Sequence, residues 1–173
     1  PQFRNPETGL IAGWRSRDGK LHDHGFSVVN GAACVGELLA PEDAREVLTA
    51  LADAWTEFGL TDFRNGIPLN LWRIPEEDIG GVIFGLPMGS YQQGGYSHHG
   101  ARVLVDAFDR VGMTELADRV LEGLATTIAD DTAFGGLGSG VDWRMADGTP
   151  SGYEGQLIEG FSVLASALRR YGV

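Results

Sequence analysis

The sequence predicts an all-α fold built from αα-hairpins, with long glycine-rich loops on one face. Five segments place apolar residues three and four positions apart, which is the period of an α-helix. Two pairs of these segments are joined by short turns, one near Ala40 and one near Gly112, as expected of αα-hairpins. Two longer connections collect most of the glycine clusters. We expect helices over residues 26–39, 41–58, 98–111, 114–130 and 153–171.

Several helix ends carry recognisable signals. Pro41 is followed by two acidic residues, which suits the first turn of a helix and its dipole, and the pattern stops at Gly59. Thr114 is a candidate N-cap. The last helix should end in Arg169-Arg170 and Gly172, since basic residues followed by glycine are typical of a helix C-terminus.

The two long connections, residues 59–97 and 131–152, are the best candidates for functional loops. Loops longer than about 15 residues in a compact domain are usually functional. They hold many of the aromatic and unusual polar residues, and many of the 26 glycines. No long alternation typical of a β-strand occurs, although a short ribbon near Ile67 to Leu71 is compatible with the sequence.

The chain is acidic and of single-domain size, covering residues 1–173. Its 24 acidic and 13 basic residues give a net charge of −11. Such a surface repels phosphate backbones and anionic lipids, so we expect neither nucleic acid nor membrane as a partner. No apolar run approaches the roughly 18 residues of a membrane span, and the first residues do not resemble a signal peptide. We therefore expect a soluble protein, whose compartment the sequence does not indicate.

Cys34 is the single cysteine, so no disulfide can form within the chain. It lies among small residues in a predicted helix. We expect a buried thiol, because free cysteines are commonly buried, with a catalytic nucleophile as the alternative.

Three segments carry a family resemblance, and they occur in the family's order. Asn65-Gly66-Ile67-Pro68-Leu69-Asn70-Leu71 resembles the Gly-Gly-Ile-Pro-Thr-Ser-Leu stretch of trehalases. The segment from Gly89 to Ser97, with Tyr91-Gln92-Gln93-Gly94-Gly95-Tyr96 at its centre, resembles the Gln-Trp-Asp-x-Pro-Asn-Gly-Trp segment of trehalases. It is also similar to the Tyr-x-Asn-Gly-Gly segment of related toroid glycosidases.

The third segment, Ser151 to Phe161, resembles Gly-Glu-Tyr-x-x-Gln-x-Gly-Phe, near which trehalases place their general base. Two departures separate this chain from trehalases themselves. Gln92-Gln93 and Tyr96 stand where the middle motif has its Trp and Asp, and Gly152 stands where the last motif has Glu before Tyr. The acidic role therefore falls on Glu154, and trehalose is not specified as the substrate.

The resemblance, which covers about residues 60–172, implies the C-terminal portion of an (α/α)6 toroid of the six-hairpin glycosidase superfamily. It implies an inverting glycoside hydrolase acting on a glucoside or oligosaccharide. The chain starts without Met and offers too few hairpins for the whole toroid, so we expect upstream hairpins to be absent. It should then be active only with that missing half, or self-associate to cover its apolar faces.

An inverting glycosidase needs two carboxyl groups about 6.5–9.5 Å apart, with aromatic faces and polar groups around the sugar. We expect catalytic carboxylates among Glu154, Glu159 and Asp23. The sugar-binding candidates from the long loops are Trp72, Tyr91, Gln92, Tyr96, His98, His99, Asp142, Trp143 and Tyr153.

Each of these candidates also has a structural interpretation. Glu154 and Asp23 suit the dipole at a helix N-terminus, and Glu159 suits a solvated helix face. Asp142 can bond its own backbone in a loop. The tyrosines around Gly94-Gly95 can be seated in the core.

His22-Asp23-His24 and His98-His99 invite a metal interpretation. Adjacent residues on one element point apart, and no Cys or carboxylate stands at ligand spacing around them. We therefore expect no metal and no cofactor.

Two other hypotheses about the function are compatible with the sequence. The same toroid can host a lyase, an isomerase or a phosphorolytic transferase, because fold alone does not decide chemistry. The chain can also be a non-catalytic helical module that binds sugar or another protein.

Overall fold

The computed structural model describes residues 2–79, 85–129, 143–149 and 162–172, and these are mostly helical. The helices are α1 (Ser27–Val35), α2 (Pro41–Phe58), α3 (Ala101–Arg110), α4 (Thr114–Ala129) and α6 (Val163–Tyr171), with a 3-10 turn η1 (Glu76–Asp78). The strands are β1 (Trp14–Arg15), β2 (Leu21–His22), β3 (Ile67–Pro68) and β4 (Tyr96–Ser97).

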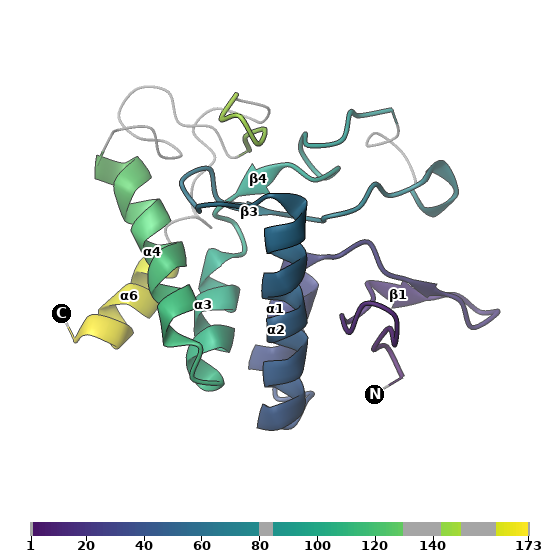
Figure 1. Cartoon of the computed structure of the whole chain (residues 1–173), viewed down its shortest axis with the longest axis horizontal. Helices are drawn as coiled ribbons and strands as arrows, with labels where there is room; N and C mark the ends of the chain where they lie inside the picture. Colours follow the sequence, from purple (N-terminus) through teal and green to yellow (C-terminus); the bar gives the residue numbers. More distant parts are fainter. Residues whose placement is uncertain (1, 80–84, 130–142, 150–161, 173) are drawn as a thin grey trace.

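The helices pack as two antiparallel pairs with a further helix beside them. α1 contacts α2 and α3 contacts α4, while α3 also contacts both α1 and α6. α2 and α4 end, and α3 begins, at the same end of the helices, and β3 and β4 cross that end (Figure 1). β3, β4 and the described residues 143–149, which pair with β4 through Arg144, therefore lie at one end of the helices.

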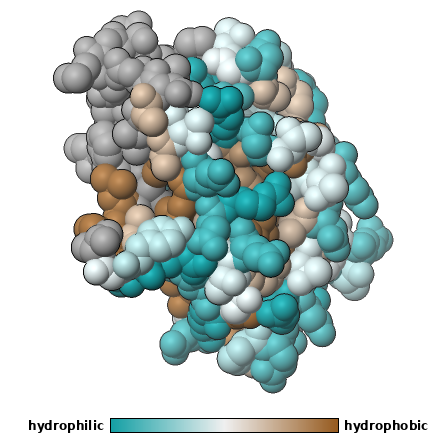
Figure 2. Space-filling view, turned by 60° about the vertical axis from the view of Figure 1, so that its left-hand side comes forward, coloured by the Kyte–Doolittle hydropathy of each residue, from teal (hydrophilic) through white to brown (hydrophobic). Residues whose placement is uncertain are grey.

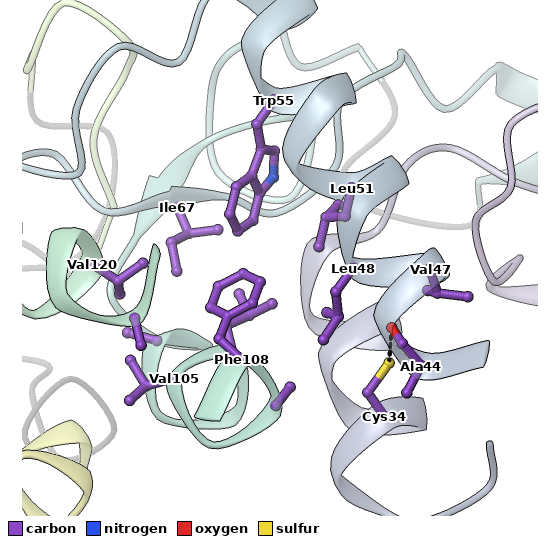
Figure 3. Close-up of a cluster of buried hydrophobic side chains, with 14 of the residues drawn as sticks. Cys34, Ala44, Val47, Leu48, Leu51, Trp55, Ile67, Val105, Phe108 and Val120 are labelled. Atoms are coloured by element: carbon purple, nitrogen blue, oxygen red, sulfur yellow. Dashed lines mark hydrogen bonds between the residues drawn. The ribbon is translucent and has the colours of Figure 1, made fainter. Parts of the chain in front are cut away.

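A continuous apolar core lies between α1, α2, α3 and α4. Phe108 is fully buried, and Trp55 packs edge-on against its ring at 6.0 Å (Figure 3). The Trp55 indole N–H donates to Ser27 Oγ at 3.0 Å, and Ser27 donates in turn to the Pro68 carbonyl at 2.7 Å. This chain of bonds joins α2, α1 and β3 and pairs the buried polar groups of Trp55 and Ser27.

Cys34 belongs to this core, as the sequence predicted. Its side chain is fully buried, with the sulfur 3.7 Å from the Ala44 carbonyl (Figure 3). Burial raises the pKa of the thiol to about 11, and the positive charge of Arg110 only partly offsets that effect. A thiol with so high a pKa is a poor nucleophile.

The predicted helix over residues 41–58 is confirmed at both ends, and Gly59 ends it with a left-handed φ of 90°. The first helix stops at Val35 instead of residue 39, because Glu37 takes a φ of 56° and Leu38 is 77% exposed. Thr114 is not the N-cap but the first helical residue, since the Met113 carbonyl accepts the first intrahelical bonds.

The third predicted helix begins later than expected, at Ala101, because Tyr96 and Ser97 pair with β3. The ribbon that the sequence allowed near Ile67 is thereby confirmed. For the fifth helix the described part starts at Val163 and ends at Gly172, whose φ of 69° matches the predicted stop.

The β1–β2 hairpin was not expected from the sequence. Trp14 pairs with His22 and Arg15 with Leu21, so each strand is only two residues long. Strands this short show no alternation that a sequence pattern can reveal.

α6 is held on α3 and α4 by polar contacts. Arg170 pairs with Asp109 and with Asp118, the latter at 2.8 Å, and Ser166 donates to Asp106 at 2.7 Å.

Next to these contacts an apolar groove opens between α4 and α6, on the face that Figure 2 brings forward. Its lining includes Leu121, Leu124, Ala125, Leu164 and Ala167. No helix in the described ranges is long and apolar enough to span a membrane.

Candidate functional site

Three segments far apart in the chain meet at the loop end of the helices. β3 and β4 pair Ile67 with Ser97 and Pro68 with Tyr96. Tyr96 then exchanges two backbone hydrogen bonds with Arg144, at 2.7 and 2.8 Å. Both long connections are therefore joined through one residue of β4.

Glycines make the tight turn ahead of β4 possible. Gly94 has a φ of 86°, and a Cβ on Gly95 would lie 2.4 Å from the Tyr91 carbonyl oxygen. The Gly95 N–H donates to that oxygen at 2.8 Å, and the Gly94 N–H donates to Asn70 Oδ1 at 2.8 Å. This geometry presents the Tyr91 ring toward residue 143.

Tyr91, His99 and Trp143 form a ring cluster, here called the Trp143 cluster. The Tyr91 and Trp143 rings meet edge-on at 5.3 Å, and His99 stacks on Trp143 at 6.1 Å and 25°. His99 and neighbouring Gln92 are exposed and Tyr91 is half-buried, whereas Trp143 is only 6% exposed. The cluster thus has accessible ring and polar atoms above a buried indole.

Tyr96 and His98 are buried residues next to this cluster in the chain, since Tyr96 pairs with Arg144 and His98 precedes His99. Tyr96 is 5% exposed, its ring stacks on Phe58 at 6.5 Å, and burial raises the pKa of its hydroxyl. Burial lowers the pKa of His98 to about 4; a hydrogen bond with the Arg64 backbone opposes this, and the charge of Arg144 adds to it. The His98 imidazole is therefore neutral at neutral pH.

Gln93 was not among the residues predicted for the site, yet it fixes the loop. Its side chain is 1% exposed; Oε1 accepts from the Ile74 N–H at 2.8 Å and Nε2 donates to the Ile74 carbonyl at 3.0 Å. This pair of bonds attaches the Tyr91 turn to the segment leading into η1. A single sequence gives no signal for such an amide clamp.

Asp23 organises the N-terminal loop. Its carboxylate accepts hydrogen bonds from Asn5 at 3.0 Å, from Thr8 at 2.5 Å and from the Gly25 N–H at 3.0 Å. A catalytic role for Asp23 stays a prediction.

The expectation that the histidines of His22-Asp23-His24 point apart is wrong for His22 and His24. Both contact Asp78 Oδ2, His22 through Nδ1 at 2.7 Å and His24 through Nε2 at 3.0 Å. We call these three residues the Asp78 cluster. Residues two apart in an extended segment share a face, and the carboxylate comes from η1, more than 50 positions along the chain.

The remaining predicted residues divide into two groups. Trp72 is 39% exposed, and its backbone N–H donates to the His24 carbonyl at 3.1 Å, which places it beside the segment that carries His22 and His24. The other four, Asp142, Tyr153, Glu154 and Glu159, lie outside the described residues.

No protein-family description matches the chain by sequence, and no curated protein matches it either.

Proposed function

We propose that this chain is the C-terminal part of an inverting glycoside hydrolase of the (α/α)6 class, acting on a glucoside or oligosaccharide. The observation that carries the proposal is the Trp143 cluster. Rings from both long connections gather there, beside exposed polar atoms of Gln92 and His99. Aromatic faces bordered by a few hydrogen-bonding groups are the usual composition of small-molecule sites.

The helix packing supports the toroid part of the proposal. In a two-layered toroid, alternate helices form an inner row and their hairpin partners form an outer row. Here α3 contacts both α1 and α6, while α2 and α4 are the hairpin partners of α1 and α3. This order matches a row α1, α3, α6 backed by α2 and α4.

In this proposal the accessible residues of the site contact the sugar directly. Tyr91, Gln92 and His99 would contact the sugar, because they keep exposed surface. Trp143, Tyr96 and His98 are each below 10% exposed and would position those residues. Glu154 would act as the general base or support it, on the strength of the motif, with the general acid contributed by another hairpin.

Binding of sugar to the 173-residue chain tests the proposal. Saturation-transfer NMR with maltotriose and with trehalose should show transfer from the wild-type protein. Tyr91→Ala and His99→Ala should each weaken binding about tenfold, equivalent to roughly 1.4 kcal/mol. Phe3→Ala, which truncates an exposed aromatic of the N-terminal loop, should leave transfer unchanged. Absence of transfer from the wild type at about 10 mM sugar, or a Kd from sugar titration that is unchanged in both site variants, contradicts the proposal.

A further inference from the structure

The Asp78 cluster brings three metal-ligating side chains together in a buried place. One ligand atom from each of His22, His24 and Asp78 lies within 4.8 Å of the other two. The side chains of His22 and Asp78 are each 6% exposed and that of His24 is 11% exposed. Such a set of two imidazoles and one carboxylate is a ligand combination common for zinc and other first-row divalent ions.

The composition of the cluster and its neighbours suits a cation. The Asp78 side chain is 6% exposed, and a buried carboxylate is costly unless it is paired or binds a metal. Glu76 and Glu77, its neighbours in the 3-10 turn, add negative charge to this part of the surface.

The surroundings of the histidines resemble the outer shell of a metal site. Trp14 stacks on His22 at 4.8 Å and 9°, and lies 5.8 Å from His24. The Nε2 atom of His22 is hydrogen-bonded to Ser16 Oγ. A metal-ligating histidine generally donates its second ring N–H to such an oxygen, which turns the other nitrogen's lone pair toward the metal. Because a hydroxyl both donates and accepts, Ser16 suits His22 with or without a metal.

We propose that His22 Nδ1, His24 Nε2 and Asp78 bind a divalent transition-metal ion, with Zn²⁺ as the representative. The carboxylate oxygen now lies 2.7 and 3.0 Å from the two nitrogens. Ligand atoms about 2.0–2.2 Å from a tetrahedral ion are about 3.3–3.6 Å apart, so the oxygen needs to separate from each nitrogen by less than about 1 Å. The two nitrogens lie within 4.8 Å of each other, which is close enough for a small adjustment to bring them to that spacing.

The ion would clip two distant parts of the chain together. It would join the β1–β2 hairpin to η1, and η1 follows the segment that Gln93 holds through Ile74. The clip is thereby connected to the turn that presents Tyr91, although the metal proposal stands independently of any sugar site.

Cobalt and zinc titrations of the chelator-treated 173-residue chain test the proposal. Co²⁺ should give visible d–d absorption bands, and Zn²⁺ should displace it with a Kd of about 1 µM or tighter. Zinc should also raise Tm by several degrees, because it binds only the folded state. Asp78→Asn and His24→Gln should each weaken zinc binding at least about 100-fold.

Two further variants sharpen the result. Glu77→Gln removes the same charge from the exposed neighbouring residue and should bind zinc like the wild type. Ser16→Ala should weaken binding about 10- to 100-fold, as the loss of a ligand-orienting partner does. Wild-type protein that is folded by circular dichroism but shows no d–d bands overturns the proposal, even if the ligand variants do not fold. Binding that survives in folded Asp78→Asn overturns it as well.

Discussion

The Asp78 cluster and the Trp143 cluster are both assembled from distant segments, yet different forces hold them. In the Asp78 cluster, two histidines converge on one buried carboxylate oxygen through hydrogen bonds. In the Trp143 cluster, ring contacts at 5.3 and 6.1 Å join Tyr91, His99 and Trp143, and His99 is exposed. Two imidazoles and a carboxylate that converge in a buried site suit a metal cation, whereas accessible rings with polar edges suit a sugar.

This contrast shows why the two regions should respond differently to change. Hydrogen bonds to a buried carboxylate depend on one atom, so removing it leaves several groups unsatisfied. A ring cluster spreads its energy over many weak contacts, so each substitution costs less.

The largest effect should come from Asp78→Ala in chelator-treated protein. The change leaves the His22 and His24 nitrogens without their buried acceptor, and we expect unfolding free energy to fall by about 3 kcal/mol. Urea denaturation measures it. Glu77→Ala, at an exposed site, should change stability by less than about 0.5 kcal/mol. Equal losses of unfolding free energy in the two variants would show that the Asp78 cluster does not stabilise the fold.

The second effect is a pH dependence of the unfolding free energy that comes from His98. The folded-state pKa of about 4 lies below the ordinary 6.5, so between these values the unfolded chain binds the proton that folded His98 excludes. The contribution of His98 to stability is complete above pH 6.5 and is lost as the pH falls toward 4, by about 1.4 kcal/mol per unit and about 3 kcal/mol in all.

Urea denaturation of the wild type and His98→Gln at several pH values checks this dependence. The variant should lack that part of the slope, whereas His99→Gln, at an exposed position, should keep it. Parallel curves for the wild type and His98→Gln are the contrary result.

The third effect is a difference in stability between two glycine substitutions, one at a closely packed position and one at an open position. A Cβ on Gly66 would lie 2.3 Å from the Ser97 carbonyl carbon, at a φ of 98°. Gly59 has a similar φ of 90° but nothing within 4 Å. Gly66→Ala should therefore cost about 2–3 kcal/mol and Gly59→Ala about 1 kcal/mol. Thermal unfolding that ranks them equally would refute the close approach of residue 66 to β4.

The smallest effect is the coupling between Tyr91 and Trp143. Their edge-on contact at 5.3 Å should contribute a coupling energy of about 1 kcal/mol in a double-mutant cycle with Tyr91→Ala and Trp143→Ala. A coupling energy near zero in chemical denaturation would mean that the rings do not contact in solution.

The helices were predictable because their signals are local. Pro41 and Gly59 bound α2 where the sequence placed its ends, since proline and glycine act on their own turn. The first helix was overextended, because the apolar pattern continues through Leu38 although that side chain faces solvent. The β1–β2 hairpin was missed because two-residue strands have no readable period.

The candidate sites were predictable only in part, for a related reason. The motif around Gly94-Gly95 pointed to Tyr91, His99 was expected as a polar residue that could bind sugar, and Trp143 was expected from its glycine-rich loop. The Asp78 cluster was missed because its carboxylate comes from η1, far along the chain from His22 and His24. Only folding brings such residues together, and without an alignment their pairing leaves no trace in one sequence.

Chemical-shift mapping of one ¹⁵N-labelled sample by maltotriose and then by Zn²⁺ tests the central claim, that two separate clusters serve two kinds of ligand. Maltotriose should shift amides of residues 89–99 and 143–149, and Zn²⁺ should shift those of residues 14–24 and 72–79. Sugar that shifts neither of the first two ranges, or zinc that shifts those ranges instead of its own, would contradict the assignment.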